Sequence, residues 1–416
     1  MSALAKVSQH DEGRDYLYPC FSRADVSFTR GDGAWLDGAD GVCYLDFATG
    51  IAVTGLGHSH PKLVEALVRQ GKKLWHVSNA VGIPEQAELA RLLCENTFAD
   101  RVFFNNSGAE AVETAIKTAR RYQFVSGRPE RFNIVTFEGA FHGRTLATIA
   151  AGGREKYLEG FGPPAPGFTV VPFGDLAALA AACDAGAAAV LLEPIQGESG
   201  VRRLEADILR QVREICDRTG ALLIFDEVQT GVGRVGNLFA YQGTGTTPDI
   251  LAAAKGLGNG FPVGACLATE KAAAGMTPGT HGSTFGGNPL AMVVASEVVE
   301  IVANEAFLSE VRRVATKLRA ALEALSALYP EVFPEVRGEG LLLGLRCGPP
   351  VAVVATAARA NGLLSVVAAE NVLRLLPPLI ITDAEVDEAF TRLNRVGNAL
   401  TATRRSATMG REGDNV

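Results

Sequence analysis

The stretch that decides the fold consists of three consecutive segments, Ala188-Ala-Val-Leu-Leu-Glu193, Glu205 to Thr219, and Ala221-Leu-Leu-Ile-Phe-Asp226-Glu-Val-Gln229. The first and third are continuous apolar runs, which are typical of strands covered on both faces. The segment between them is predicted to be a helix. A strand, a helix and a second strand in this order predict one unit of a parallel sheet.

The same alternation extends outward, from about residue 100 to residue 270. Further strands are predicted at Arg101–Asn105, Phe132–Phe137 and Phe168–Pro172, and a helix at Ala109–Tyr122. The fold class is therefore α/β, with a mostly parallel sheet and helices on both sides. Ligands on such sheets bind at the carboxyl ends of the strands. Three features are expected at these ends: Glu193, Asp226 and the turn at 105–108.

Both ends of the chain have a different pattern. Residues 26–49 predict short antiparallel strands separated by Asp-Gly turns. After Gly287 a long helical stretch is followed by the strand-like runs 341–345 and 372–376 and a final helix from Asp383 to Leu400. We expect a smaller α+β domain built from both ends. The predicted boundaries are 1–50 for the N-terminal part of this small domain, 51–290 for the large domain, 291–402 for the C-terminal part and 403–416 for a disordered tail.

Composition excludes several classes of protein. Hydrophobic residues make up 47% and charged residues 20% of the 416 positions, as in ordinary globular enzymes. The formal net charge of −7 argues against a nucleic-acid partner, because such a surface needs a basic stripe. The apolar stretch from Ala177 to Leu192 is interrupted by Asp184, so no membrane span is predicted.

The N-terminus and the cysteines indicate a cytoplasmic protein. Residues Met1 to His10 lack the basic and apolar regions of a signal peptide. The seven cysteines are dispersed without the spacing of a metal site, so we expect reduced thiols and no metal.

Asp226 and Lys255 are the residues most informative about chemistry. Lys255 follows the apolar segment Ile250-Leu-Ala-Ala-Ala254 and precedes a glycine-rich turn, a poor position for a solubilising surface charge. A desolvated lysine loses its proton more readily and can form a Schiff base with an aldehyde cofactor. A buried carboxylate at a strand end can keep a pyridine nitrogen protonated, so that the ring accepts electrons from a carbanion. Together the two residues predict a pyridoxal 5'-phosphate enzyme. Taken singly, each could also be an ordinary turn or capping residue.

Several blocks of sequence resemble the class III pyridoxal-phosphate aminotransferases, over nearly everything from Asp25 to about Leu400. The blocks are Gly50 to Pro61, Asn106-Ser-Gly-Ala-Glu-Ala-Val-Glu113, Phe137 to Thr145, Leu192-Glu-Pro-Ile-Gln-Gly-Glu198, Phe225 to Arg234, Ala254-Lys-Gly256, His281 to Pro289 and Asn371 to Pro378. The resemblance implies fold type I and a homodimer. It also implies transfer of the δ-amino group of N-acetylornithine to 2-oxoglutarate, giving N-acetylglutamate 5-semialdehyde and glutamate in arginine biosynthesis.

The resemblance implies a role for each site residue. The cofactor-binding residues would be Ser107, Gly108, Ala109, Phe141, Asp226, Glu227, Val228, Gln229, Lys255 and Thr284. The helix beginning near Ala109 offers free N–H groups to the phosphate, and Thr284 would reach that phosphate from the neighbouring subunit. Phe141 and Val228 would hold the two faces of the ring. Lys255, Asp226 and Glu198 would be the catalytic residues.

Two arginines are candidates for recognising substrate carboxylates, because a guanidinium can bind a carboxylate through two parallel hydrogen bonds. The resemblance assigns Arg144 to the α-carboxylate of acetylornithine and Arg374 to that of 2-oxoglutarate or glutamate. Glu198 would neutralise Arg374 while the ω-amine reacts and then move aside. The resemblance also implies that Ser283 contacts the substrate. Ordinary surface salt bridges would be the alternative interpretation of these side chains.

Some positions depart from the family pattern and leave the substrate open. Phe21 stands where relatives often carry a tyrosine, residues 80–82 replace a Leu-Tyr-Arg-like stretch, and Ser199 replaces a common glycine. Succinylornithine, ornithine and 4-aminobutyrate remain alternative amine donors, and aminomutase chemistry is a related possibility. A cofactor-binding regulator without turnover would be expected to lack Lys255 or Asp226. A purely structural role as a scaffold would not explain the arginine pair or the predicted cofactor-binding residues.

Overall fold

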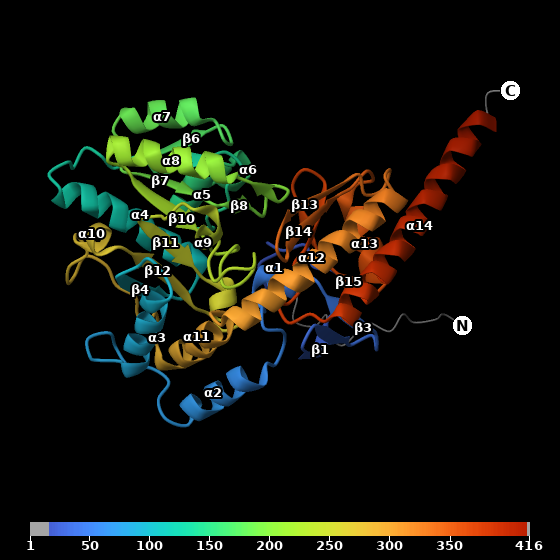
Figure 1. Cartoon of the computed structure of the whole chain (residues 1–416), viewed down its shortest axis with the longest axis horizontal. Helices are drawn as coiled ribbons and strands as arrows, with labels where there is room; N and C mark the ends of the chain where they lie inside the picture. Colours follow the sequence, from blue (N-terminus) through green and yellow to red (C-terminus); the bar gives the residue numbers. More distant parts are fainter. Residues whose placement is uncertain (1–15, 414–416) are drawn as a thin grey trace.

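The structure, a computed structural model, describes the backbone of residues 16–413 and the side chains of residues 16–402. Two lobes are visible in Figure 1: a larger one around a central sheet, and a smaller one that contains strands from both ends of the described chain. The N-terminal segment 1–15, included in the predicted small domain, lies outside the described residues.

The large lobe is organised by a seven-stranded sheet of order β4-β12-β11-β10-β7-β5-β6. Its strands are β4 (Arg101–Asn105), β5 (Ile134–Phe137), β6 (Phe168–Val171), β7 (Ala189–Leu192), β10 (Leu222–Asp226), β11 (Ile250–Ala253) and β12 (Gly264–Ala268). Strands β6, β5, β7, β10 and β11 pair in parallel, whereas β12 is antiparallel to both of its neighbours. The prediction of a mostly parallel α/β sheet is confirmed.

Alternate residues of β10 are buried on opposite faces of this sheet. Leu223 and Phe225 belong to the same apolar cluster as Leu209 of α8 (Ala206–Thr219). Leu222 and Ile224 pack in a second cluster, which includes the apolar face of α4 (Gly108–Val125). Burial on both faces explains why the strand is a continuous apolar run. It also fixes the carboxyl end of β10, where Asp226 lies, in a rigid setting.

The remaining elements of the large lobe cover or connect this sheet. They are α1 (Thr49–Ala52), α2 (Pro61–Gly71), α3 (Pro84–Glu95), α5 (Leu146–Gly152), α6 (Glu155–Leu158), α7 (Leu176–Asp184), α9 (Tyr241–Thr244), the 3₁₀ turn η2 (Lys255–Leu257), α10 (Glu270–Ala273) and α11 (Pro289–Val302). Figure 1 shows α7 and α8 side by side over the sheet. A hairpin of β8 (Ile195–Gln196) and β9 (Arg202–Arg203) follows β7.

The smaller lobe has two four-stranded sheets. One contains β1 (Phe28–Asp32), β2 (Trp35–Gly38), β3 (Cys43–Asp46) and β15 (Leu363–Leu364). The other contains β13 (Glu335–Glu339), β14 (Leu342–Arg346), β17 (Val372–Leu375) and β16 (Val366–Ala368). The pairing of β3 with β15, Leu45 opposite Leu363, joins the two ends of the chain in one sheet. The domain boundaries at residues 50, 290 and 402 remain our proposal.

Long helices complete this lobe: α12 (Glu305–Leu328), α13 (Val351–Ala360) and α14 (Asp383–Gly413). Helix α14 packs on α12 and continues past the predicted end near Leu400, as the projecting helix in Figure 1. The backbone is thus helical over 403–413, where the sequence predicted a disordered tail. The absence of proline, and of glycine before Gly410, allows the helix to continue there.

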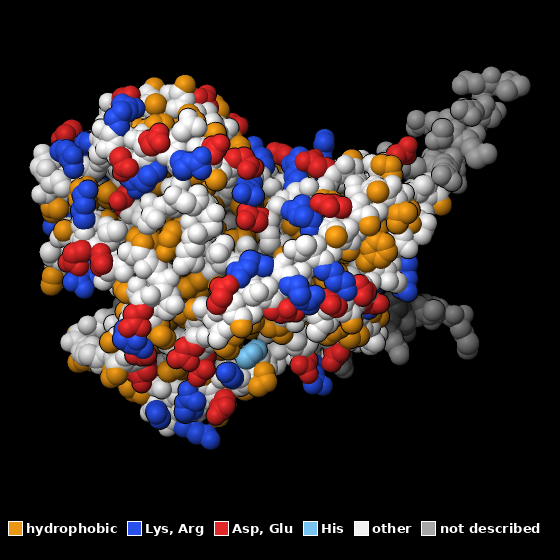
Figure 2. Space-filling view, viewed as in Figure 1, with side chains coloured by type: hydrophobic (Ala, Val, Ile, Leu, Met, Phe, Trp, Pro, Cys, Tyr) orange, Lys and Arg blue, Asp and Glu red, His pale blue; other side chains and the backbone are white. Residues whose placement is uncertain are grey.

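The surface is of mixed charge. Figure 2 shows acidic and basic side chains interspersed over the visible face. Within residues 16–413, none of the helices combines the length and hydrophobicity needed to cross a bilayer. The cysteines of the described region are free thiols, four of them buried.

Candidate active site

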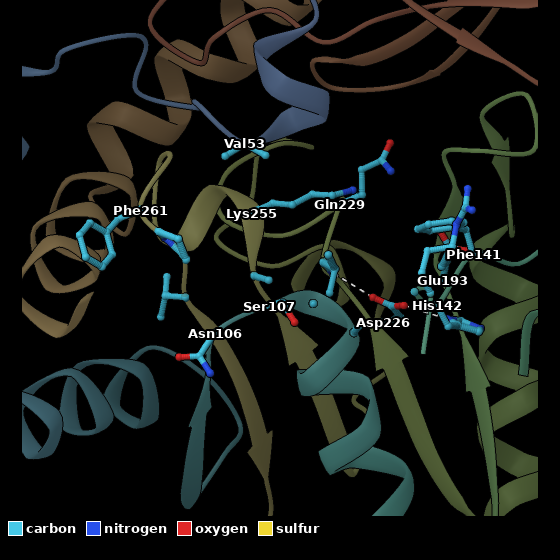
Figure 3. Close-up of a pocket in the computed structure, with 18 of the residues that line it drawn as sticks. Val53, Asn106, Ser107, Phe141, His142, Glu193, Asp226, Gln229, Lys255 and Phe261 are labelled. Atoms are coloured by element: carbon cyan, nitrogen blue, oxygen red, sulfur yellow. Dashed lines mark hydrogen bonds and ion pairs between the residues drawn. The ribbon is translucent and has the colours of Figure 1, made fainter. Parts of the chain in front are cut away.

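A cavity of about 410 Å³ lies at the carboxyl ends of the central strands (Figure 3). Its walls come from the ends of β4, β7, β10 and β11, from the N-terminus of α4, and from the turn after β5. The lining residues are Val53, Asn106, Ser107, Gly108, Ala109, Phe141, His142, Gly143, Arg144, Glu193, Asp226, Val228, Gln229, Ala254, Lys255, Gly260, Phe261, Pro262 and Val263. This is the edge of the sheet at which the sequence predicted a ligand site.

Lys255 begins the turn η2 directly after β11, and its side chain extends across the cavity in Figure 3. Its φ is +47°, an uncommon conformation for a non-glycine residue that is held here by the buried strand before it. The residue is half-buried, and among the described residues no hydrogen bond or ion pair involves its amine. Burial, reinforced by the positive charge of Arg374, lowers the pKa of Lys255 to about 8. The amine therefore gives up its proton more easily than an exposed lysine does.

Asp226 is the last residue of β10 and is buried. One carboxylate oxygen accepts a hydrogen bond from the Val228 N–H at 3.1 Å. The other lies 2.8 Å from Nδ1 of His142, which is also buried (Figure 3). His142 was not among the predicted site residues. Its position after Phe141 in the quoted block was the only signal, because nothing in the local pattern places it opposite β10.

Glu193 is a second buried carboxylate in the cavity wall, and sequence reasoning placed it at a strand end without a role. It accepts a hydrogen bond from the Phe141 N–H at 2.8 Å, which fixes the turn that carries Phe141. Burial raises the pKa of Glu193 to about 7, an effect opposed by His142 and reinforced by Asp226. The cavity wall thus holds two buried carboxylates: Asp226 lies beside His142, whereas Glu193 accepts a hydrogen bond from a backbone N–H.

The N-terminus of α4 opens onto the cavity. Ser107 caps the helix, and its Oγ accepts a hydrogen bond from the Glu110 N–H at 3.2 Å. No acceptor within the described region is recorded for the N–H groups of Gly108 and Ala109. A methyl group on Gly108 would lie 2.7 Å from a methyl of Val228, so the helix start can approach β10 only with glycine there. Free N–H groups at a helix N-terminus form an anion site.

Phe141 and Arg144 lie on the opposite wall. The Arg144 guanidinium stacks on the ring of Tyr157 at 3.9 Å and lies 5.5 Å from the Phe141 ring. Phe141 and Tyr157 meet edge to face, with ring centroids 6.1 Å apart. Sequence reasoning missed Tyr157, because only its contact with the two predicted residues marks it. The stacking holds an exposed guanidinium at the cavity without neutralising it.

Arg374 in β17 is completely buried and contacts two predicted site residues. It donates hydrogen bonds to Glu198 Oε1 at 2.7 Å and to Gln229 Oε1 at 2.8 Å. The predicted pairing of Arg374 with Glu198 is therefore present. Because Glu198 keeps 23% of its side chain exposed, it is the partner with room to move.

Five predicted site residues do not line this cavity: Glu198 and Arg374 adjoin it through Gln229, and the other three are Glu227, Ser283 and Thr284. Glu227, expected at the cofactor, turns its carboxylate instead toward the backbone N–H groups of Ala240 and Tyr241. It therefore stabilises the turn before α9 and does not line the cavity. Ser283 accepts hydrogen bonds from Asn106 and the Gly286 N–H, and Thr284 beside it is exposed. A single chain does not bring Thr284 to its own cavity.

One departure from the family pattern and the possibility of a metal site bear on the predicted chemistry. Phe21, a departure from the family pattern, is 73% exposed, and its ring lies 5.4 Å from the Arg23 guanidinium. In the part of the chain that the structure describes, no group of His, Cys, Asp and Glu side chains could hold a metal ion.

Comparisons with known proteins agree with this geometry. The family model for aminotransferase class-III matches residues 21–396. The acetylornithine aminotransferase of Agrobacterium fabrum is 57% identical over 93% of this chain and 97% of its own length. That of Brucella melitensis is 58% identical over 91% and 94%.

Solved structures also match over almost the whole chain. The ornithine aminotransferase from Toxoplasma gondii superposes with a TM-score of 0.90 at 33% identity, covering 94% of each chain. The N-acetylornithine aminotransferase from Stenotrophomonas maltophilia gives a TM-score of 0.81 at 39% identity, covering 92% of this chain and 98% of that one.

Proposed function

The chain belongs to the class-III aminotransferases, and from this membership we propose that it transfers the δ-amino group of N2-acetyl-L-ornithine to 2-oxoglutarate. The products are N-acetyl-L-glutamate 5-semialdehyde and L-glutamate, a step of arginine biosynthesis. The observation that carries the proposal is the unpartnered amine of the half-buried Lys255, in a cavity that also contains Asp226 and adjoins the Arg374–Glu198 pair. Relatives named for acetylornithine support this choice of substrate.

The residues around the cavity fit pyridoxal 5'-phosphate. Free N–H groups of Gly108 and Ala109, with the Ser107 hydroxyl, suit a phosphate, and Asp226 suits a protonated ring nitrogen. Phe141 and Val228 would contact the ring faces, and Gln229 its hydroxyl group. When bound, pyridoxal phosphate supplies an aldehyde that captures amines and a ring that accepts electrons.

Lys255 would do the proton transfers. With a pKa of about 8, its Nζ can be neutral or protonated near neutral pH, so it can take a proton from one atom of the substrate and return it to another. Asp226, held 2.8 Å from His142 Nδ1, would face the ring nitrogen and hold a proton on it. The low dielectric of this buried site strengthens that contact.

The two arginines would divide the substrates. Arg144 is exposed at the cavity and pre-positioned by Tyr157, so it can bind the α-carboxylate of acetylornithine at a distance from the reacting δ-amine. Arg374 is neutralised by Glu198 while that amine reacts. When Glu198 moves aside, Arg374 can bind the α-carboxylate of 2-oxoglutarate, which adjoins the reacting carbon.

We also propose that the enzyme is a cytoplasmic homodimer. Large apolar side chains are exposed on the single chain, among them Tyr18 at 88%, Trp75 at 67% and Phe285 at 61%. Phe285 adjoins the exposed Thr284. A two-fold partner covering this surface would bring Thr284 to the phosphate of the neighbouring site.

Single-turnover absorbance measurements test the substrate. The holoenzyme is mixed separately with acetylornithine, succinylornithine, ornithine and 4-aminobutyrate, and the loss of the aldehyde form of the cofactor is followed. Acetylornithine is expected to react fastest at equal concentration. If another of these amines is clearly faster, that amine replaces acetylornithine as the substrate while the fold and cofactor assignments remain.

Borohydride reduction tests the cofactor assignment separately. Peptide mass analysis after reduction should place the cofactor on Lys255. A label on a different lysine would refute the assignment of Lys255.

A further inference from the structure

The hairpin that carries Glu198 is attached to the protein on two sides. Strands β8 and β9 are joined by the loop 197–201, which contains Glu198 and Ser199. On the side of the small lobe, the backbone oxygen of Glu198 accepts a hydrogen bond from the Ala369 N–H at 3.0 Å. The backbone oxygen of Gly200 accepts one from Arg337 at 3.3 Å.

The second attachment is made by the Ser199 side chain. Its hydroxyl donates to the backbone oxygen of Gly139 at 2.5 Å and accepts a hydrogen bond from Arg154 Nη2 at 2.5 Å. Arg154 also donates to the Gly139 oxygen, so the three groups form a closed triangle. Ser199 is buried, with 5% of its surface exposed. Exchange of these bonds with water is therefore hindered.

Two neighbouring side chains of the hairpin reinforce the contact. Gln196 donates to the backbone oxygen of Glu138 at 3.1 Å, and Arg202 donates to the same oxygen at 3.0 Å. A methyl group on Gly139, whose φ is +80°, would lie 2.8 Å from the Ser199 hydroxyl, so the approach is close. The β8–β9 hairpin thus packs on the turn at residues 138–139, which leads to Phe141 and Arg144.

Arg154 stabilises the contact between the hairpin and the turn at Gly139 and is not placed to bind an anion. No acidic partner for it is recorded in the described part of the chain, and its guanidinium lies 5.8 Å from the ring of Tyr157. Tyr157 is the ring on which Arg144 stacks. The triangle therefore connects the loop of Glu198 to the neighbourhood of the other substrate arginine.

We propose that Ser199 is a positioning residue, which together with Arg154 fixes the hairpin backbone so that only the side chain of Glu198 moves when Arg374 is released. This inference rests on the proposed function, in which Glu198 covers Arg374 for one substrate and uncovers it for the other. The fixed backbone holds the Glu198 carboxylate at the 2.7 Å contact with Arg374. Without the Ser199 hydroxyl, the closed pair is less favoured relative to the open one.

A specificity change follows from this shift. An arginine uncovered more of the time binds 2-oxoglutarate more readily, so the KM for 2-oxoglutarate falls. The same arginine is less well neutralised during the reaction of the ω-amine, so the KM for acetylornithine rises. Because one or two hydrogen bonds are lost, the ratio of the two KM values should change by about two- to tenfold. The kcat should change less than this ratio.

The experiment uses the holoenzyme with Ser199→Ala, Arg154→Met and the double variant. Each single variant is expected to shift the KM ratio in the stated direction. The double variant should shift it no further than the larger single effect, because both substitutions break the same triangle. Amide hydrogen exchange should be faster at Ala369, whose N–H bonds to Glu198, and unchanged in β5. Ser365→Ala is the matched control, since the buried Ser365 hydroxyl has no hydrogen-bond partner in the described structure.

The outcomes separate a positioning role from a structural one. A lower melting temperature with equal changes in both KM values would overturn the proposal, and so would an unchanged ratio with unchanged exchange at Ala369. Additive shifts in the double variant would show that the two side chains act independently, which also contradicts it. Failure of the proposed function is seen differently, as a wild-type enzyme that does not turn over this substrate pair. Exchange at Ala369 still tests the attachment in that case.

Discussion

At the scale of single residues, the site depends on charges that are buried before any substrate arrives. Lys255 has the least usual surroundings, because its half-buried side chain lines the cavity and its amine lacks a hydrogen-bond or ion-pair partner in the described structure. Its pKa falls from 10.5 to about 8. The unfolded chain therefore binds a proton at Lys255 more strongly than the folded chain does. Below pH 8, the charged Lys255 amine therefore lowers the free energy of unfolding by its full amount. This destabilisation decreases as the pH rises from about 8 toward 10.5.

This penalty gives a stability prediction for the cofactor-free protein. Lys255→Met should be more stable than wild type at pH 7, by on the order of 3 kcal/mol if each pKa unit contributes about 1.4 kcal/mol. The difference should shrink as the pH is raised through the window above 8. Denaturant unfolding at several pH values measures it. A less stable variant at pH 7, or a difference independent of pH, would contradict the burial argument.

Asp226 is expected to matter more for rate than for binding. Asp226→Asn keeps the size of the side chain but removes the charge that holds a proton on the ring nitrogen. That interaction gains most of its value as negative charge develops on the ring, so kcat should fall by about 10²-fold or more while KM changes little. Steady-state kinetics at saturating substrates measure this. Near wild-type kcat in Asp226→Asn would show that the carboxylate does not act on the ring.

Arg144 and Arg374 should affect different half-reactions. Arg144→Ala is expected to weaken acetylornithine by at least about tenfold, because a charge-assisted contact is lost, and to leave 2-oxoglutarate nearly unchanged. Arg374→Ala is expected to weaken 2-oxoglutarate and glutamate most. Rapid-mixing measurements of each half-reaction compare the two variants. Equal damage to both half-reactions by both variants would refute the division.

At the scale of elements, the start of α4 combines a helix N-terminus with close packing on β10. The approach depends on Gly108, where a methyl group would lie 2.7 Å from Val228. Because Val228 precedes Gln229 in the cavity wall, a shift there moves both the phosphate site and the ring site. The same element is predicted by its sequence, in which the cap Ser107 precedes a run of good helix formers.

Gly108→Ala should therefore weaken cofactor binding by about tenfold or more, through loss of the backbone approach that glycine permits. The helix itself should persist, since alanine is a better helix former than glycine. Fluorescence titration of the cofactor-free protein measures the Kd. Gly71→Ala in α2 is the matched control, because a methyl group there meets only ordinary contacts. Equal Kd values for the two variants would exclude a role for this packing.

At the scale of the whole molecule, the exposed position of Thr284 predicts an active site shared between subunits. Lys255→Ala should be inactive, and Thr284→Val should be weakly active at limiting cofactor. Mixing and reassociating them should restore activity, because a hybrid dimer has one site with both native residues. Activity is measured before and after reassociation. Hybrids that stay inactive would show that Thr284 acts within its own chain, or not at all.

The sequence by itself determined the elements and the chemistry they carry. Continuous apolar runs and helical segments identified β4, β7, β10, α4 and α8, because burial and backbone hydrogen bonding act over short stretches of chain. The places of Lys255 and Asp226 at strand ends followed from the same runs. Family-like blocks then supplied the remaining site candidates, of which most line the cavity.

Tertiary structure alone decided which distant residues meet. The sequence did not predict that β12 enters antiparallel between β4 and β11, or that His142 faces Asp226. Nor did any local pattern place Tyr157 under Arg144, or turn Glu227 away toward the start of α9. These contacts join side chains that are separated along the chain, and their geometry is set by how whole elements pack. Hydrophobic periodicity and secondary-structure propensity describe only neighbours in sequence. Which distant side chains contact one another is therefore decided only when the sheet and its loops assemble.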